Sequence, residues 1–448
     1  MKKRSLIILL SVAVLIICAM AAVMTGCKTK GDEYADLVAI RINNHMAEWV
    51  DSSYNFDYKG VGELNVTVPY TNYLEINDLI VSPEAYAIIY EDETCSEKLK
   101  DSDYKIYVDG SKSLYVKVTN NNKSNVYKVN ITVKQTNLPE GVDLSAKSYD
   151  NRGGHIYIPE GATEVKIDGE VYAVVNRLHE LDSNRADEYT NFIASGNFGY
   201  SSISTVREFT RNTFNGVFDG NGYSMFIDPM QANDADNDYN RAFFSRIGKS
   251  GVVKNIVLNY YGNAQSVETN VISNNTAFIC YENYGVIDNI VNIVDVCDLH
   301  TELNGEGEEK YVHRLAIFAN INCGVISNCL NKGNIRGLEN NSKVRQFSVF
   351  ANEMYSDGNI RPGAGAKLIN CVNMGDIDCN SAAKGNKCES GAYLIAALAD
   401  KNVTVEGVYN VGAINNDKGN KNFAHAISVD GKASVRKIDC SRIKDYTK

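Results

Sequence analysis

A short pattern that occurs five times between Gly251 and Ile414 constrains the fold more than any other feature of this 448-residue chain. Its copies are GVVKNIVLNYYG from Gly251, GVIDNIVNIVDV from Gly285, GVISNCLNKGNI from Gly324, AKLINCVNMGDI from Ala366 and VTVEGVYNVGAI from Val403. They are spaced by about 40 residues, and the spacing varies as it does when loops differ in length. A period of this size indicates a solenoid, in which each repeat packs on its neighbours.

The aligned copies share one aliphatic column and two asparagine columns. The aliphatic column, at the third position, is Val253, Ile287, Ile326, Leu368 and Val405. The fifth position holds Asn255, Asn289, Asn328 and Asn370, with Gly407 in the last copy. The eighth position holds Asn292, Asn331, Asn373 and Asn410 in the last four copies. Asparagine and glycine tolerate left-handed backbone conformation, so we expect a bend at the fifth position.

These columns predict a β solenoid. Amides that stack one per turn can hydrogen-bond along the stack, so the asparagine columns are expected to form ladders. The apolar runs are short and lack the 3.6-residue period of helical repeats. We therefore expect an all-β chain whose repeats form a parallel β-helix.

The first 27 residues predict a targeting segment. A basic start is followed by an apolar stretch from Leu6 to Val23, as in a signal peptide. Met24-Thr25-Gly26-Cys27 resembles a bacterial lipobox, although Met24 stands where leucine is usual, and the resemblance implies lipidation of Cys27. An uncleaved membrane anchor is the alternative, since the apolar run is near spanning length. Both alternatives place the rest of the chain outside the cytoplasmic membrane, tethered to it and facing the cell exterior.

Residues 28–34 predict a short tether, and residues 35–137 predict a first domain of strands with alternating apolar residues. The alternating sets are Leu64, Val66 and Val68; Leu114, Val116 and Val118; and Tyr127, Val129, Ile131 and Val133. VTVPYTNYLEINDLIVSP from Val66 and SLYVKVTNNNKSNVYKVNITV from Ser113 resemble the cadherin-like β-sandwich domain of bacterial surface proteins. The resemblance implies an antiparallel sandwich that acts as a spacer or adhesion module.

Residues 138–154 are polar and rich in glycine, so they predict a linker to a second domain at residues 155–448. Beyond a short strand at 155–158, apolar residues recur at helical spacing, with Asp168 as a possible N-cap. They are Val171, Val174, Val175, Leu178 and Leu181. We expect this amphipathic helix to cover the open end of the solenoid.

The stretch FNGVFDGNGYSMFI from Phe214, with AFFSRIGKSGVVKNIVLN after it, resembles the first rung of GLUG-motif repeat proteins. The segments CLNKGNI, CVNMGDI and VYNVGAI fit the same family, although Ala366 and Val403 replace its glycine. The resemblance implies a right-handed parallel β-helix of pectate-lyase-like type. Residues 433–438 are expected to form a final partial rung, with the basic tail after them covering the open end.

Charge and motif content exclude several function classes. The net charge of −10 argues against a nucleic-acid partner, which calls for a concentrated basic face. The six histidines show no paired ligand spacing of the kind that zinc sites use. No serine-hydrolase, zincin or nucleotide-binding motif occurs.

The cysteines do not predict a disulfide framework. Nine remain after Cys18 and Cys27, and an odd number outside the cell argues against complete pairing. Cys329 and Cys371 share a column with aliphatic residues, so we expect small core side chains there. Cys379 and Cys388 flank a polar loop and form the one candidate pair, which the sequence leaves open.

Asp234, Asp236 and Asp238 form the most metal-like stretch, because alternating carboxylates begin many calcium loops. An EF-hand loop would continue with glycine and glutamate where Tyr239 and Ser245 stand. A solvated acidic loop is therefore the favoured interpretation, and no cofactor is predicted beyond this weak calcium candidate.

A polysaccharide lyase or glycosidase would need basic side chains and a carboxylate that converge in a groove. The candidates beside successive repeats are Arg314, Arg345, Arg361 and Lys367. Their spacing singles out no catalytic pair, and loop arginines and lysines are mostly solvated.

The sequence therefore favours a non-catalytic, lipid-anchored surface protein, in which a sandwich stalk presents a β-helix. Its inter-repeat loops would bind a glycan or a protein of a host or cell surface. A lyase or glycosidase and a purely structural spacer are the alternatives, because fold alone does not establish activity.

Overall fold

The computed structural model describes residues 34–50, 62–71, 73–99, 105–108, 110–134, 154–175, 189–199, 213–227, 242–260, 267–269, 275–298, 312–337, 344–359, 361–379, 391–400, 402–416 and 443–446. Over these residues the chain is all-β, and no helix is present. The stretches named here accordingly contain no helix with the length and apolar character needed to span a bilayer. The predicted all-β class with parallel strands is confirmed.

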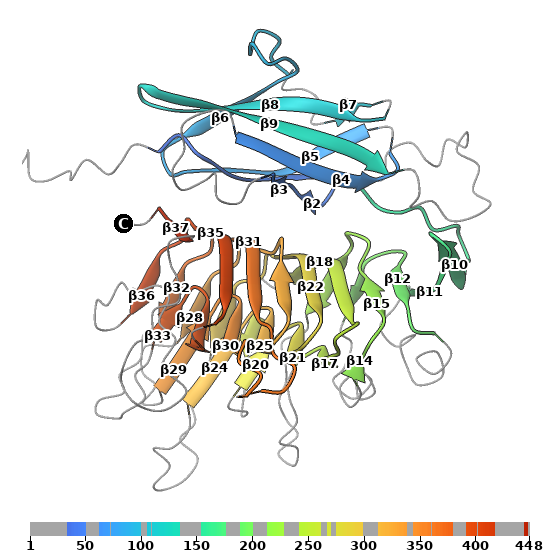
Figure 1. Cartoon of the computed structure of the whole chain (residues 1–448), viewed down its shortest axis with the longest axis vertical. Helices are drawn as coiled ribbons and strands as arrows, with labels where there is room; N and C mark the ends of the chain where they lie inside the picture. Colours follow the sequence, from blue (N-terminus) through green and yellow to red (C-terminus); the bar gives the residue numbers. More distant parts are fainter. Residues whose placement is uncertain are drawn as a thin grey trace, which may run out of the picture.

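The first domain consists of two sheets that pack around one apolar core (Figure 1). One sheet has the order β2 (His45–Met46), β1 (Leu37–Ile42), β5 (Tyr73–Val81) and β7 (Lys105–Tyr107). The other has the order β3 (Glu48–Trp49), β4 (Gly62–Pro69), β9 (Lys123–Lys134), β8 (Lys112–Asn120) and β6 (Tyr86–Tyr90). The core contains the alternating residues that the sequence singled out, since burial follows every second position of β4 and β8.

The second of these sheets is mixed, which corrects the expectation of a purely antiparallel domain. β8 and β9 form an antiparallel hairpin, with Asn121 at a positive φ in its turn. β4 instead pairs with β9 in parallel over eight residue pairs, from Gly62 to Pro69. The alternation of apolar residues is the same for parallel and antiparallel pairing, so the sequence could not separate the two.

Residues 154–446 form a coiled region in which the chain passes repeatedly through four sheets (Figure 1). Coil sheet 1 contains β10 (Glu164–Ile167), β11 (Glu170–Val175), β12 (Phe192–Ala194), β13 (Phe198–Gly199), β15 (Val217–Asp219), β16 (Ser224–Ile227), β18 (Val252–Tyr260), β22 (Val286–Asn292), β26 (Val325–Ser327), β27 (Leu330–Asn331), β31 (Lys367–Asn373), β35 (Thr404–Asn410) and β37 (Ile443–Asp445). Except for the β10–β11 pair, every pairing in it is parallel.

The other three sheets complete each turn in chain order. Coil sheet 2 contains β19 (Val267–Thr269), β23 (Val296–Asp298), β28 (Ile335–Gly337), β32 (Ile377–Cys379) and β36 (Ile414–Asn416). Coil sheet 3 contains β20 (Asn275–Ala277), β24 (Val312–Ala316), β29 (Val344–Ser348) and β33 (Gly391–Tyr393). Coil sheet 4 contains β14 (Thr213–Phe214), β17 (Phe244–Ile247), β21 (Cys280–Asn283), β25 (Ala319–Asn322), β30 (Ala351–Met354) and β34 (Ala396–Ala399).

Residues that share a column in the aligned repeats are register partners in coil sheet 1. The aliphatic column is paired residue by residue in the order Val253, Ile287, Ile326, Leu368, Val405. Its side chains point into the coiled region and are almost fully buried. All four asparagines of the fifth position and Gly407 have positive φ, between 49° and 61°. The bend therefore lies where asparagine and glycine predicted it.

The asparagine amides are stacked along the coiled region. In the eighth-position column, each Nδ2 donates to the Oδ1 of the next turn, from Asn292 through Asn331 and Asn373 to Asn410, at 2.7–2.8 Å. In the fifth-position column, Asn289 donates to Asn255, and Asn370 donates to Asn328. Asn328 donates instead to Asp288, so this column is divided into two segments.

The predicted capping helix is wrong over the described residues. β10 and β11 form an antiparallel hairpin, with Asp168 and Gly169 in its turn at φ of 52° and 88°. Two consecutive positive φ values are typical of the tight turns of β-hairpins, and Asp-Gly is a preferred sequence for them. Val171, Val174 and Val175 are β-branched and lie in β11, whereas Leu178 and Leu181 fall outside the described residues.

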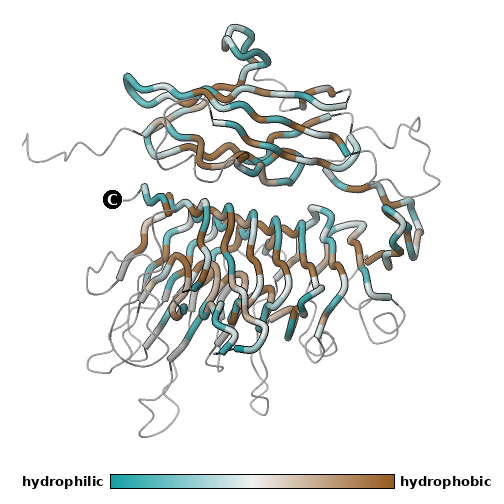
Figure 2. Tube along the Cα trace, viewed as in Figure 1, coloured by the Kyte–Doolittle hydropathy of each residue, from teal (hydrophilic) through white to brown (hydrophobic). Residues whose placement is uncertain are grey.

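The core of the coiled region is aliphatic and aromatic, as the brown segments of its strands show (Figure 2). Phe318 and Phe350 stack on adjacent turns with ring centroids 5.6 Å apart. Cys329 and Cys371 are fully buried and unpaired in this core, as their column predicted. Burial raises the pKa of the Cys329 thiol. Both side chains therefore act as small apolar groups.

The first domain lies along the coiled region and packs against it, rather than extending from it as a stalk (Figure 1). An apolar cluster joins β1, β2 and β5 to coil sheet 1. Its buried members are Val38, Ala39, Met46 and Ile80 from the first domain and Val291, Leu330, Val372, Tyr409 and Tyr446 from the coiled region. The two parts thus share a buried apolar interface, which the polar linker sequence did not predict.

Ion pairs and a hydrogen bond extend this interface to the last strand of the stack. Asp78 is almost fully buried and pairs with both Arg41 and Lys332. At the last turn, Asp36 contacts Lys444 and accepts a hydrogen bond from Tyr446. The final strand β37 pairs with β35, and Lys444 within β37 contacts the first domain. The partial rung expected at 433–438 lies outside the described residues.

Candidate ligand-binding groove between the domains

The asparagine bend divides the outer face of coil sheet 1 into two halves. The half after the bend carries Val291, Leu330 and Val372 and is covered by the first domain, so we call it the docked half. The half before the bend is called the open half. A cavity of about 370 Å³ lies over it, and we call this cavity the interdomain groove. Its lining residues are Glu48, Trp49, Val252, Val286, Asp288, Val325, Ser327, Asn328, Ile369, Asn370, Glu406 and Gly407.

The first domain supplies one wall of the groove through β3. Trp49 is the only tryptophan of the chain, and its ring is half-buried. One edge of the ring packs against Tyr127 in the core of the first domain, with centroids 5.8 Å apart. Its indole nitrogen has no protein hydrogen-bond partner in the described structure. The ring is thus fixed by packing and keeps one donor for a ligand.

Asparagines of the fifth-position column hold this wall in place. Asn289 donates to the carbonyl of Asn44 and accepts from the amide of Met46. Asn370 donates to the carbonyl of Ala47 at 3.1 Å. The segment before β3 is therefore bound to the bend of coil sheet 1, which sets the height of Trp49 above the open half.

The floor of the groove contains two carboxylates that share one amide. Asn328 Nδ2 donates to Glu48 Oε1 at 2.8 Å and to Asp288 Oδ1 at 2.9 Å. Ser327 Oγ also donates to Asp288 Oδ1, at 2.6 Å. Burial, and secondarily the charge of Glu48, raise the pKa of Asp288. An exposed carboxylate of the first domain, Glu48, therefore meets a partly buried carboxylate of the coiled region, Asp288.

The far end of the groove is open because a glycine interrupts the asparagine column. Gly407 has a φ of 61°, and a Cβ added to it would meet Asn370 only at 3.7 Å, which is ordinary contact. Glu406 beside it makes no hydrogen bond or ion pair within the described part of the protein. The last copy of the repeat therefore widens the groove and presents an unpaired carboxylate to it.

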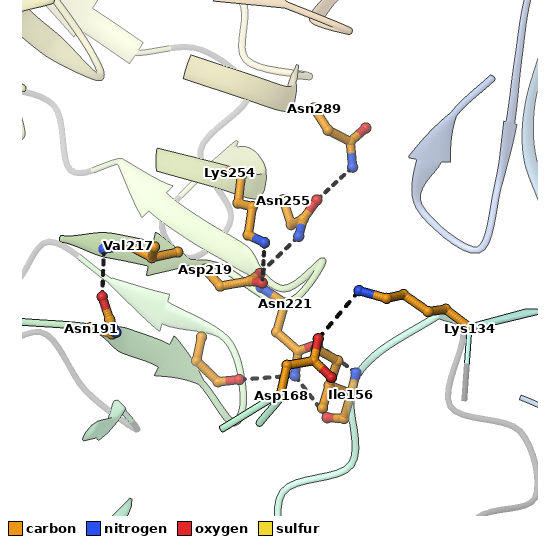
Figure 3. Close-up of polar contacts among 11 residues, drawn as sticks. Lys134, Ile156, Asp168, Asn191, Val217, Asp219, Asn221, Lys254, Asn255 and Asn289 are labelled. Carbon is orange, nitrogen blue, oxygen red and sulfur yellow. Dashed lines mark hydrogen bonds and ion pairs between the residues drawn. The ribbon is translucent and has the colours of Figure 1, made fainter. Parts of the chain in front are cut away.

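On the strand next to Val252 of the groove lining, β15, a polar network surrounds Asp219 (Figure 3). Lys254 pairs with Asp219 at 3.3 Å, and Asn255 Nδ2 donates to the same carboxylate at 2.9 Å. The charge of Asp219 raises the pKa of Lys254. The cation nearest to Asp288 is therefore already engaged by a carboxylate outside the groove.

His45 is half-buried close to this network, at the tip of the β1–β2 hairpin. Burial lowers its pKa to about 4. Asp219 acts in the opposite direction, whereas Arg41, Lys254 and His155 add to the lowering. The imidazole is thus neutral at pH 7 and forms part of the interdomain contact.

Two of the predicted basic residues, Arg314 and Arg361, both lie near Tyr355, which is not part of the groove lining. Arg314 donates to Glu353 and to Gln346. Arg361 donates to Glu282 at 3.0 Å and lies over the Tyr355 ring at 5.2 Å. Lys367 lies on the exposed face of coil sheet 1 instead, and the side chain of Arg345 falls outside the description.

This cluster, in which Arg314 of coil sheet 3 meets acidic residues of coil sheet 4, is a set of satisfied ion pairs. Glu282 also accepts from Arg246, so that it is held between two guanidinium groups. Burial and the neighbouring Glu353 raise the pKa of Tyr355, which keeps its phenol protonated. An arginine engaged in this way cannot offset a substrate carboxylate without breaking its pair, so the cluster fastens the segment around Arg361 to the coil.

Several predicted residues lie outside the described part of the chain: Cys27, Asp234, Asp236, Asp238, Cys388 and the side chain of Cys379. Among the residues that are described, no group of three or more histidine, cysteine or acidic side chains is arranged to hold a metal ion.

The groove itself was not predicted from the sequence. Glu48 and Trp49 are more than 200 residues from Asp288, and no spacing rule connects them. The usable signals were local ones: a single tryptophan beside an acid, and a glycine in place of asparagine in the last repeat.

Comparison with known proteins gives no match: no protein-family model, no curated protein and no solved structure is similar to this chain.

Proposed function

We propose that this chain is a non-catalytic, lipid-anchored cell-surface protein that binds carbohydrate in the interdomain groove. The observation that carries the proposal is a cavity of about 370 Å³ walled by the single tryptophan and lined by carboxylates and amides. Aromatic rings stack on the apolar faces of sugar rings, and carboxylates and amides accept and donate hydrogen bonds to hydroxyls. A volume of this size is within the usual range of ligand pockets.

In this proposal the coiled region is a right-handed parallel β-helix and the first domain is a cadherin-like β-sandwich. The parallel pairing of successive turns supports the first part, since parallel crossover connections are almost always right-handed. Two sheets around one apolar core support the second. The buried interface between them supports a rigid binding unit rather than a stalk and a head.

The binding test compares the purified protein with two variants on a panel of neutral oligosaccharides by calorimetry. Trp49→Ala removes the stacking surface, and Gly407→Asn restores the asparagine of the other repeats and narrows the groove. Asparagine tolerates the φ of 61° at this position, so Gly407→Asn is expected to fold normally.

We expect both variants to weaken binding by about tenfold or more, in line with the loss of one stacking contact. Met374→Ala, an exposed change elsewhere on the coiled region, is the control and should bind normally. Absence of binding by the unaltered protein to every glycan tested would overturn the proposal.

The anchor is tested separately, through Cys27. Cys27→Ser is expected to abolish incorporation of a fatty-acid label and to prevent processing of the signal segment. Cys18→Ser, within the apolar stretch, is the control. Equal labelling of both variants would contradict a lipid on Cys27.

A further inference from the structure

We propose that the interdomain groove selects oligosaccharides that carry protonated amino groups, such as glucosamine chains. This inference rests on the proposed carbohydrate binding and names its ligand class. Three of the lining residues are acidic, Glu48, Asp288 and Glu406, and no lysine or arginine is among the lining residues. Lys367, the register partner of the lining residue Val325, lies beside the groove, but the lining itself carries one charge sign and attracts ligands of the other.

The acidic groups retain oxygens for a ligand. The protein hydrogen bonds of the first two end on Glu48 Oε1 and Asp288 Oδ1, which leaves Glu48 Oε2 and Asp288 Oδ2 without a protein partner in the described structure. Glu406 has both oxygens available. An ammonium group can therefore be received without breaking an existing contact, and it would relieve the proximity of two carboxylates.

The acidic groups are arranged along the stack, so an elongated ligand fits them. Asp288, Ser327, Ile369 and Glu406 are register partners on four successive strands of the open half. With a strand spacing of ~4.8 Å, the two acids lie about 14 Å apart. One pyranose unit has about the length of one strand spacing, and the stretch would therefore span a short chain of amino sugars.

Two alternatives fit the groove less well. Uronate polymers carry carboxylates, which would meet three acids and no basic lining residue. Extended peptides bind by adding a strand to a free sheet edge. The floor of the groove is a sheet face whose strands are already paired on both sides. The wall strand β3 ends its sheet but has only two residues, so a peptide backbone finds at most a very short edge to join.

The experiment compares tetraglucosamine with its fully N-acetylated counterpart on the same protein at pH 6, by calorimetry at low and high salt. We expect tetraglucosamine to bind about tenfold or more tightly, and salt to reduce only its affinity. Glu48→Gln and Glu406→Gln should each lower its affinity by about five- to tenfold and leave binding of the N-acetylated chain unchanged. Glu160→Gln, an exposed acid away from the groove, is the matched control.

The outcomes separate this inference from the function on which it rests. Equal affinity for both tetrasaccharides would overturn the amino-sugar selectivity and leave carbohydrate binding intact. Binding of neither would overturn the amino-sugar selectivity, and the carbohydrate-binding function would fail with it only if no oligosaccharide of the neutral panel bound either. Equal or tighter binding of tetralysine would show that the groove takes cationic peptides, which also overturns the inference. Thermal unfolding of each variant, expected to be unchanged, shows that losses of affinity are not losses of fold.

Discussion

The docked half and the open half of coil sheet 1 are built from the same strands, and they differ only in what their outward side chains meet. On the docked half these are Val291, Leu330, Val372 and Tyr409, all buried under the first domain. On the open half one outward row is Lys254, Asp288, Ser327, Ile369 and Glu406, a mixture of charged, polar and apolar groups. The inward residues of both halves are apolar: aliphatic side chains, with Cys329 and Cys371 among them on the docked half.

The inward residues, which repeat from copy to copy, therefore determine the coiled scaffold. The outward residues, which differ between the two halves, determine what each half contacts. The asparagine bend separates the two surfaces and also binds the first domain. A single column therefore both shapes the coil and fixes the wall of the groove. The predictions below test the contrast between the two halves.

The largest loss in the free energy of unfolding is expected for a substitution at the centre of the docked half. Leu330→Gln places an amide in a fully buried apolar contact, and we expect a loss of about 3–5 kcal/mol in the free energy of unfolding. The matched change Val325→Gln lies on the open half, where the side chain is half-buried, and should cost under ~1 kcal/mol. Denaturant unfolding measures both; equal costs would show that the two halves are not distinct surfaces.

A substitution in the buried asparagine ladder is expected to lower the free energy of unfolding by nearly as much as Leu330→Gln. Asn331→Ala removes bonds to Asn373 and to the carbonyl of Gly333, and it leaves Asn292 with only one of its two acceptors, the carbonyl of Val294. We expect a loss of about 2–3 kcal/mol, because unpaired buried amides retain their desolvation cost. Exposed Asn402→Ala is the control. A denaturation midpoint like that of the control would mean that the ladder does not stabilise the fold.

Stability is expected to fall at acid pH because of His45, which lies at the edge of the docked half. Burial lowers the pKa of His45 from 6.5 to about 4, so between these values the unfolded chain binds a proton that the folded protein does not. The contribution of His45 to stability is therefore complete above pH 6.5 and falls as the pH is lowered. We expect a loss of about 1–2 kcal/mol between pH 7 and pH 5.

The control for this prediction is His45→Gln, which removes the titrating group. Unfolding curves at pH 7 and pH 5 should show a smaller pH dependence for the variant than for the unaltered protein. Identical dependences would assign the acid sensitivity to other groups, among which Asp288 acts in the opposite direction because its pKa is raised.

The smallest change in the free energy of unfolding is expected for a substitution in the core of the coiled region, which the two halves share. Cys371 is paired in register with Val408 of the next turn and is fully buried. Cys371→Val should therefore change the free energy of unfolding by less than about 1 kcal/mol, in either direction. Thermal unfolding measures this; a loss of several kcal/mol would show that the thiol is more than a space-filling group.

The coiled region could be predicted from the sequence because its information is repeated. Five copies make the aliphatic and asparagine columns visible, and each column corresponds to one row of register partners. The positive φ of Asn255 and Gly407 follows from residue type alone. Where only one copy exists, the prediction was wrong: Val171, Val174 and Val175 suit a helix by spacing, but Asp168-Gly169 and β-branching favour a hairpin.

The docking of the first domain, and with it the groove, could not be predicted in the same way. Leu330 and Val372 occupy outward positions, but a strand that alternates imperfectly looks the same whether its outer face meets water or protein. Trp49 and Asp288 are brought together by that docking, not by any local pattern. Contacts between residues this far apart in the sequence produce no periodic pattern from which a single sequence could predict them.

The contact between Asp36 and Tyr446 joins residues 410 positions apart, the first domain and the last strand of the stack. During synthesis the first domain is made long before the last strand of the stack, so part of its apolar face stays uncovered until that strand has been made. Docking along the whole interface is therefore complete only after the last turn has formed, and a premature stop within the repeats yields a chain that exposes part of this face to other molecules.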